Sequence, residues 1–133
     1  MRLIGRVLST KLATPGDGVS YGYTHRVTAP TVLALVTGGY AQGVVRALGN
    51  QVDVEIADAL HPIVGRVAMD VCVVDLETAD LGAAESFEGA DAVFFGGNGA
   101  ARSTLARWAE VTGMTARELI TVAGAKAVRE WTS

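Results

Sequence analysis

Short apolar runs separated by glycine or polar residues recur from residue 2 to about residue 95, and runs of this length fit strands better than helices. The clearest is QVDVEIA at 51–57, where Val52, Val54 and Ile56 alternate with acidic residues. This alternation predicts a strand with one apolar and one charged face. Four further regions are expected to contain strands: 2–10, 19–27, 31–39 and 91–95.

The run HPIVGRVAMDVCVVDL at 61–76 is long enough for two strands or for one strongly bent strand. We expect the break near Gly65 or Asp70. On the residues alone, Asp70 is equally well explained as a solvated carboxylate beside a core strand. Tyr40 and Arg46, on and after GGYAQG, are likewise consistent with a packed tyrosine and a surface arginine.

The hydrophobic period becomes helical near the C-terminal end. Residues 105–112 place Leu, Trp, Ala and Thr on one face, with Ser103 in position to cap the helix and Gly113 to end it. The sequence TARE at 115–118 matches a capping box, so a second helix is expected to about Ala123. Less regular expectations are one or two helical turns within 41–50 and a last strand in the tail from 125 to 131.

Composition supports one domain over residues 1–133. Half of the residues are hydrophobic, which allows a single substantial core, and sixteen glycines with only three prolines favour many bends. Many short strands followed by a pair of helices predict a mainly β fold. We expect a closed or partly closed β-barrel with two short C-terminal helices within residues 102–124.

Charge and apolar patterning exclude several classes of partner. The net charge is −3, from 11 basic and 14 acidic residues without a basic run, so no nucleic-acid partner is expected. No apolar stretch nears the roughly 20 residues of a membrane span. The start, MRLIGRVLST, holds two arginines and no small-residue cleavage site, which argues against a signal peptide. Cys72 is the only cysteine and has apolar neighbours, which predicts a buried thiol and a cytoplasmic location.

Three patterns bear on cofactor or metal chemistry. GGNGAARST at 96–104 has the glycine-rich layout that can bind phosphate at a helix start, but it lacks both the P-loop ending and G-x-G-x-x-G, so a plain strand-to-helix turn is favoured. His25 and His61 have no ligand partners at metal-binding spacing, so no metal site is expected. Lys11 and Lys126, the only lysines, lie in no recognisable cofactor motif.

GDGVSYGYTH at 16–25 sets Tyr21 between Ser20 and Gly22 in a chain with only three tyrosines. Turn chemistry explains this stretch. The alternative is that Tyr21 is presented to another molecule, and the residues alone leave both explanations open.

An ordered set of motifs separates these alternatives. It consists of VSYGYT at 19–24, GGYAQGVVRAL at 38–48, PIVGRVAMD at 62–70 followed by Asp75, and DAVFFG at 91–96; TGMTARELI at 112–120 and the tail with Arg129 and Trp131 match less sharply. Together they resemble the C-terminal domain of alanine racemase, a pyridoxal-phosphate enzyme, from about residue 3 to residue 131. The resemblance implies the interconversion of L-alanine and D-alanine for cell-wall precursors by a homodimer.

The resemblance also implies roles for individual residues. Racemisation needs two acid/base groups that flank the α-carbon. In this family one is the lysine that holds the cofactor in an N-terminal TIM-type barrel, and the other is a tyrosine from the partner subunit, which Tyr21 matches. Met69 matches the residue whose backbone N–H binds the substrate carboxylate, and Tyr40 a second substrate-binding residue. Tyr40 also lines, with Arg46 and Arg66, the channel through which substrate enters.

The sequence departs from the family pattern at several positions. Gln42 stands where the family has Asp, Ala68 replaces a common cysteine, Arg117 replaces a tyrosine, and residues 125–128 blur a closing motif. Because the cofactor domain and its lysine are missing, we expect an excised domain that neither binds pyridoxal phosphate nor racemises alanine alone. Two alternatives are a non-catalytic barrel module for binding or dimerisation, and part of a racemase for another small amino acid.

Overall fold

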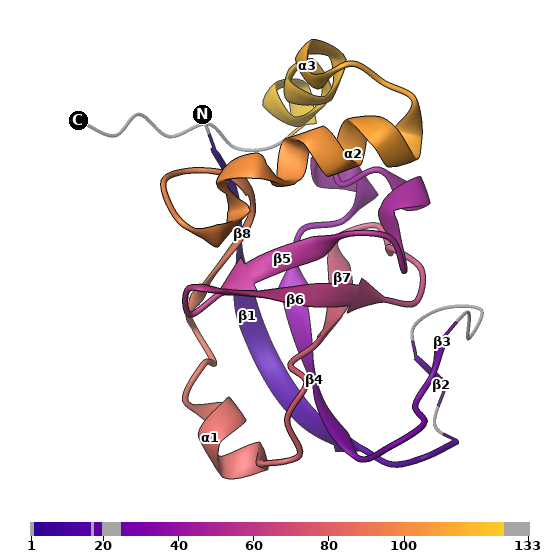
Figure 1. Cartoon of the computed structure of the whole chain (residues 1–133), viewed down its shortest axis with the longest axis vertical. Coiled ribbons are helices and arrows are strands. Elements are labelled where there is room, and N and C mark those ends of the chain that lie inside the picture. The colour runs from indigo at the N-terminus through magenta and orange to yellow at the C-terminus, as the bar shows by residue number, and fades with distance from the viewer. Residues whose placement is uncertain (1, 17, 20–24, 127–133) are drawn as a thin grey trace.

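A computed structural model describes residues 2–16, 18–19 and 25–126 of the chain. Six antiparallel strands close into a barrel in the order β1-β4-β7-β6-β5-β8, with β8 paired to β1 (Figure 1). Their bounds are β1 Arg2–Ala13, β4 Thr31–Thr37, β5 Asp53–Ile56, β6 Ala59–Val64, β7 Val71–Asp75 and β8 Asp91–Gly96. A separate two-stranded ladder joins β2, Gly18–Val19, to β3, His25–Arg26. The predicted closed barrel is confirmed.

The long strand β1 closes the barrel because its two halves pair with different neighbours. Its first half pairs with β8, from Arg2 opposite Gly96, and its second half pairs with β4, ending with Ala13 opposite Thr31. The two halves meet near Gly5, where an added Cβ would collide with the Thr37 carbonyl. Glycine at this position therefore lets two strands approach closely.

Alternating side chains fill the barrel. Val54 and Ile56 of β5 are fully buried, whereas Asp53 points to solvent, as the 51–57 pattern predicts. Buried residues from every barrel strand join one core, which includes Val7, Val36, Ile63, Val74 and Phe94. Each strand thus contributes one apolar face to the interior.

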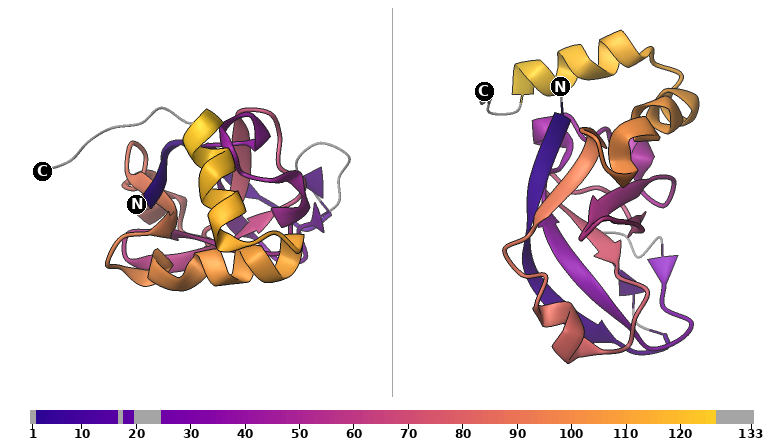
Figure 2. Two further views of the ribbon diagram at one scale, coloured as in Figure 1. Left: turned by 90° about the horizontal axis from the view of Figure 1, so that it is seen from above. Right: turned by 60° about the vertical axis from the view of Figure 1, so that its left-hand side comes forward.

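Helices cover both ends of the barrel. The short helix α1, Leu81–Glu85, lies at one end, while α2, Thr104–Thr112, and α3, Ala116–Lys126, lie at the other (Figures 1 and 2). Gly113 ends α2, as predicted, and it adopts the left-handed conformation. Among the described helices none has the length and apolar character needed to cross a bilayer.

The capping box that starts α3 is confirmed. Thr115 N–H donates to Glu118 Oε1 and Glu118 N–H donates to Thr115 Oγ1, both at 3.1 Å. Ser103, in contrast, stands at the N-cap of α2 without a side-chain hydrogen bond. A 3₁₀ turn at Ala100–Ser103 leads directly into the helix, so the chain is already coiled before the cap position.

Several predicted boundaries need correction. The 31–39 strand ends at Thr37, whereas the two-strand alternative for 61–76 is confirmed, with its break over residues 65–70. Within 19–27, Val27 lies outside the strands, and residues 20–24 fall outside the described part of the chain. Helix α3 continues to Lys126, past Ala123, so a last strand cannot begin at residue 125. The sequence patterns do not predict helix α1, which Asp80 caps by accepting a hydrogen bond from Ala83 N–H at 3.0 Å.

Cys72 lies on β7 with its side chain inside the barrel, as predicted. Burial raises the pKa of this thiol from an ordinary value of 9.0 to about 12, because the thiolate would lose its hydration. Above about pH 9 the unfolded chain releases this proton while the folded chain keeps it. Stability linked to this group is therefore present below pH 9 and lost as the pH rises toward 12.

We therefore expect the free energy of unfolding to fall by up to about 1.4 kcal/mol more per pH unit above pH 9 in the parent chain than in a Cys72→Ala variant. Urea unfolding at several pH values from about 8 to about 11 measures both slopes. Because other groups titrate identically in the two proteins, the difference isolates the thiol. Equal slopes would mean that the thiolate is accommodated in the folded barrel.

Candidate functional site

Two turn segments, 38–50 and 65–70, lie side by side because of the register of the barrel. Strands β4 and β7 pair with Thr37 opposite Val71, so the residues that follow β4 meet those that precede β7. Tyr40 N–H donates to the Ala68 carbonyl at 3.0 Å, and Ala41 N–H donates to the Met69 carbonyl at 2.8 Å. These hydrogen bonds bring Tyr40 and Met69, two of the sequence-predicted site residues, onto one surface.

The approach of these segments is close enough to require glycine at position 39. A Cβ on Gly39 would collide with the Ala68 carbonyl oxygen and would lie 2.5 Å from Met69 backbone atoms. Gly38 N–H adds a hydrogen bond to the Asp70 carbonyl at 2.9 Å. The pairing of the two turns is therefore set by the backbone and leaves the side chains of Tyr40 and Met69 to face outward.

This surface carries an exposed apolar side chain beside a positive charge. Met69 is 55% exposed and Tyr40 is 36% exposed. The Arg46 guanidinium carbon, from the 3₁₀ turn Arg46–Leu48, lies 5.4 Å from the centre of the Tyr40 ring. A cation over an aromatic face is attracted by about 0.5–1 kcal/mol at an exposed site, so the contact orients both side chains.

Arg66 belongs to the same pair of turns. A Cβ on Gly49, just after the Arg46 turn, would lie 3.2 Å from the Arg66 Cα. Gly65 N–H donates to Asn50 Oδ1 at 2.6 Å, which ties the base of the Arg66 turn to the other segment. The Arg66 side chain is exposed.

Helix α3 supports the turn that carries Tyr40. Gly43 ends the 3₁₀ turn Tyr40–Gln42 with φ of 93°, and a Cβ there would lie 2.6 Å from the Ala123 Cα of α3. Leu119 of α3 is fully buried, and α3 in turn contacts α2, whose Trp108 is also fully buried. The turn that carries Tyr40 therefore packs against α3, which in turn packs against α2 at this end of the barrel.

Gln42 also belongs to this surface. In the sequence it stands out only because the family has an aspartate at this position, so a carboxylate is replaced by an amide. Its side chain accepts from Gly39 N–H and donates to Asp70 Oδ1, each at 2.9 Å. Asp70 is exposed, yet it is hydrogen-bonded across the two segments. The replacement of the family's aspartate by Gln42 is therefore the one feature of the sequence that points to this bridge between the two segments.

In the glycine-rich loop at 96–104, a backbone N–H binds a carboxylate of the protein itself. Ala101 N–H donates to Glu55 Oε1 at 2.7 Å, and a Cβ on Gly99 would lie 2.6 Å from the same oxygen. Glu55 belongs to β5, so its carboxylate occupies the place where a phosphate would have to bind. The loop is a strand-to-helix turn whose amide faces a negative charge.

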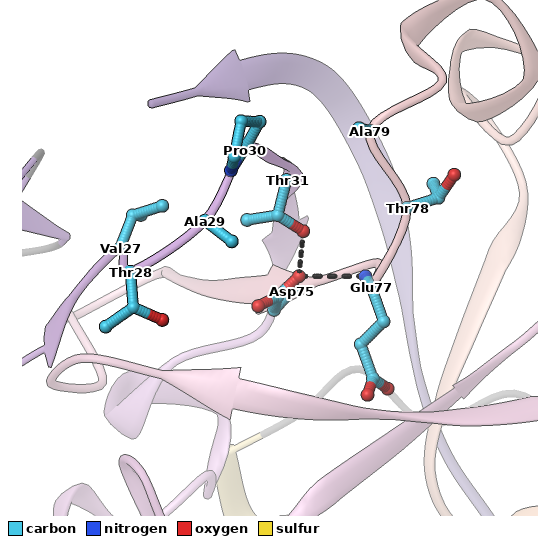
Figure 3. A pocket seen from close by; sticks show the side chains of 9 residues that line it. All are labelled: Val27, Thr28, Ala29, Pro30, Thr31, Asp75, Glu77, Thr78 and Ala79. Atoms are coloured by element: carbon cyan, nitrogen blue, oxygen red, sulfur yellow. Dashed lines mark hydrogen bonds between the residues drawn. The ribbon is translucent and has the colours of Figure 1, made fainter. Parts of the chain in front are cut away.

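A cavity of about 310 Å³ is lined by residues from 27–31 and 75–79 (Figure 3). It lies beside Asp75, the last residue of β7, whereas Met69 precedes the first residue of that strand. Asp75 accepts hydrogen bonds there from Thr31 Oγ1 at 2.5 Å and from Glu77 N–H at 2.8 Å. The five residues of β7 span roughly 17 Å, so this cavity is separate from the Tyr40 and Met69 surface. Asp75 therefore joins the start of β4 to the end of β7.

The remaining candidates have ordinary surroundings. Lys11 is exposed on β1, and His61 Nδ1 lies 3.7 Å from Glu77 Oε1. Across the residues that the structure describes, no three histidine, cysteine or acidic side chains gather as a metal-binding group. Tyr21 and the tail residues Arg129 and Trp131 lie outside the described residues.

The family model for the alanine racemase C-terminal domain matches residues 1–131. The chain belongs to this family. The alanine racemase of Mycolicibacterium vanbaalenii is 41% identical over 116 residues, and that of Beutenbergia cavernae is 36% identical over 129 residues. These matches cover 87% and 97% of this chain, but only 29% and 33% of the two relatives.

Solved alanine racemases contain the same fold as this C-terminal domain. The structure of alanine racemase from E. faecalis superimposes with a TM-score of 0.82 at 28% identity, covering 98% of this chain and 33% of that one. The enzyme from a D-cycloserine-producing Streptomyces lavendulae gives a TM-score of 0.78 at 34% identity, covering 95% and 32%. The racemase C-terminal domain described here therefore spans about a third of the length of these relatives.

Proposed function

We propose that this domain forms one side of an alanine racemase active site, with Tyr21 as the acid/base on one face of the substrate α-carbon. The observation that carries the proposal is the joining of the Tyr40 turn to the Met69 segment by backbone hydrogen bonds, with an arginine beside them. Family membership supplies the reaction, and this surface supplies groups suited to its substrate.

The main chain of Met69 suits a carboxylate. Met69 N–H has no hydrogen-bond partner among the described residues, although the carbonyl of the same residue accepts from Ala41. A backbone N–H without a protein partner can donate a charge-assisted hydrogen bond to a carboxylate, and the Arg46 guanidinium, which lies over the Tyr40 ring, supplies a positive field that attracts anions to this surface. We assign substrate-carboxylate binding to Met69, contact with substrate to Tyr40, and attraction of substrate into the site to Arg46 and Arg66.

The described residues do not fit pyridoxal phosphate. The loop that resembles a phosphate site faces the Glu55 carboxylate, which would repel a phosphate. Lys11 is exposed on the barrel wall, away from the Tyr40 turn that follows β4. We therefore expect the cofactor to be held by an N-terminal barrel domain of the kind found in the family, with this domain contributing substrate contacts and Tyr21 across a homodimer interface.

A chimera tests this proposal. The N-terminal part of the Mycolicibacterium vanbaalenii racemase, joined to this chain in place of its own C-terminal domain, should bind pyridoxal phosphate and racemise alanine, measured by polarimetry. The N-terminal part alone and this chain alone should each be at least about 100-fold slower, because each lacks a positioned acid/base. A chimera that folds and binds the cofactor but racemises no faster than its N-terminal part would contradict the proposal. Serine assayed in parallel tests specificity for another small amino acid.

A further inference from the structure

Gln42 connects the two segments of the substrate surface through its side-chain amide. Its Oε1 accepts from Gly39 N–H and its Nε2 donates to Asp70 Oδ1, both at 2.9 Å. A primary amide can make both hydrogen bonds at once because it carries a donor and an acceptor, whereas an ionised carboxylate offers acceptors only. The bridge therefore depends on an uncharged amide at position 42.

We propose that Gln42 is a positioning residue that fixes the Met69 main chain beside Tyr40 and so sets the affinity of the site for the amino-acid substrate. This inference deepens the proposed function and rests on it. Gly39 precedes Tyr40, and Asp70 follows Met69, so the bridge holds the immediate neighbour of each substrate-contacting residue.

The bridge also acts on charge. Asp70 is the carboxylate nearest in sequence to Met69, whose N–H is the donor assigned to the substrate carboxylate. A hydrogen bond from Gln42 Nε2 disperses part of the negative charge on Asp70, which lowers its repulsion of an incoming anion. Geometry and charge thus lead to the same expectation, that loss of the amide weakens substrate binding more than it slows the chemical step.

Two isosteric substitutions distinguish the effect of losing the bridge from a general loss of stability. Gln42→Glu keeps the acceptor for Gly39 but sets two carboxylates against each other. Asp70→Asn alone should be mild, because the new amide oxygen can still accept from Gln42. In the double variant, Gln42→Glu with Asp70→Asn, the amide introduced at position 70 can donate to the carboxylate introduced at position 42, and the net charge equals that of the parent.

The chain also offers a matched control for the added charge. Gln51 is exposed and makes no side-chain hydrogen bond within the described part of the chain. Gln51→Glu therefore introduces the same negative charge as Gln42→Glu without breaking a bridge between the two segments. Any effect that the two variants share is due to charge alone.

Hydrogen exchange of the chain gives the first measurement. Gln42→Glu should speed exchange of the Gly38, Tyr40 and Ala41 amides by about five- to tenfold, because their acceptors lie on the 68–70 segment. Barrel-strand amides should change less than about twofold, and the double variant should return to within about twofold of the parent. Gln51→Glu should match the parent throughout. Unchanged turn amides, no recovery in the double variant, or equal acceleration in all strands would each overturn the positioning role.

Kinetics of the chimera give the second measurement. Gln42→Glu should raise KM for alanine by about five- to tenfold and change kcat by less than about twofold, with recovery in the double variant. A fall in kcat at constant KM would overturn the proposal. A parent chimera that folds and binds the cofactor but has no racemase activity would overturn the proposed function and, with it, the substrate part of this inference. The exchange result would still decide whether Gln42 holds the two segments together.

Discussion

Replacing Tyr21 with phenylalanine is expected to lower alanine racemisation by the chimera at least about 10²- to 10⁴-fold, the usual loss when a positioned acid/base is removed. Phenylalanine keeps the ring and removes only the hydroxyl, so the change tests proton transfer rather than packing. Racemisation requires proton removal on one face of the α-carbon and proton return on the other. With one of the two groups gone, the cycle cannot close at its normal rate.

The exchange of the substrate α-proton with solvent deuterium distinguishes this role from a structural one. The group on the opposite face remains in the Tyr21→Phe variant, so one alanine enantiomer should still exchange much faster than the other, as followed by proton NMR. Equal and slight slowing of both enantiomers would show that Tyr21 is a turn residue. Tyr40→Phe is a matched control, because it removes a hydroxyl assigned to substrate contact, and should leave the exchange of the two enantiomers balanced.

Replacing Trp108 with alanine should cost about 3–5 kcal/mol of stability and lower the thermal unfolding midpoint by roughly 10–20 °C. Trp108 is fully buried, and its ring meets those of Phe95 and Phe94 edge-on, with centroids 5.2 and 6.4 Å away. Truncation leaves a large cavity where α2 packs on the barrel. Calorimetry or thermal circular dichroism measures the loss.

The preceding residue of α2 provides the control for this change. The Arg107 side chain is 54% exposed and pairs with Glu110 at 3.1 Å, so Arg107→Ala should change stability by no more than about 0.5 kcal/mol. Because α2 contacts α3, and α3 supports Gly43, Trp108→Ala should also loosen the turn that carries Tyr40. A midpoint equal to that of Arg107→Ala would show that α2 contributes little to the core.

Periodicity in the sequence predicts those elements whose side chains alternate or repeat over several turns. The alternation at 51–57 and the helical face around Trp108 both correspond to real faces of the barrel and of α2. Helix α1 cannot be predicted in this way because five residues are too few to display a helical period. Asp80, which caps this helix, is equally compatible with a turn. The 3₁₀ turn before α2 likewise has no distinct sequence pattern.

The site is less accessible to pattern reasoning because it depends on register. Tyr40 and Met69 are far apart in the sequence and lie on turns, and they meet only because Thr37 pairs with Val71. A shift of β4 against β7 by one pair would separate them, and no periodicity fixes that choice. The resemblance to the racemase family therefore supplied these residues, while the Gln42 bridge, which the same register creates, needed the structure.

The closure of the barrel through β1 and β8 bears on how the domain acquires its fold during synthesis. Strand β1 is the first barrel strand to be synthesised. Because Arg2 pairs with Gly96, the hydrogen bonds of its first half cannot form until β8 has also been synthesised. Such high contact order makes folding slow, and until β8 arrives the edge of β1 presents unpaired backbone groups together with the exposed side chains of Ile4 and Leu8. Nascent chains that end before Asp91 therefore have an unpaired strand edge that can pair with other chains. The domain is most prone to aggregation in the interval before the barrel closes.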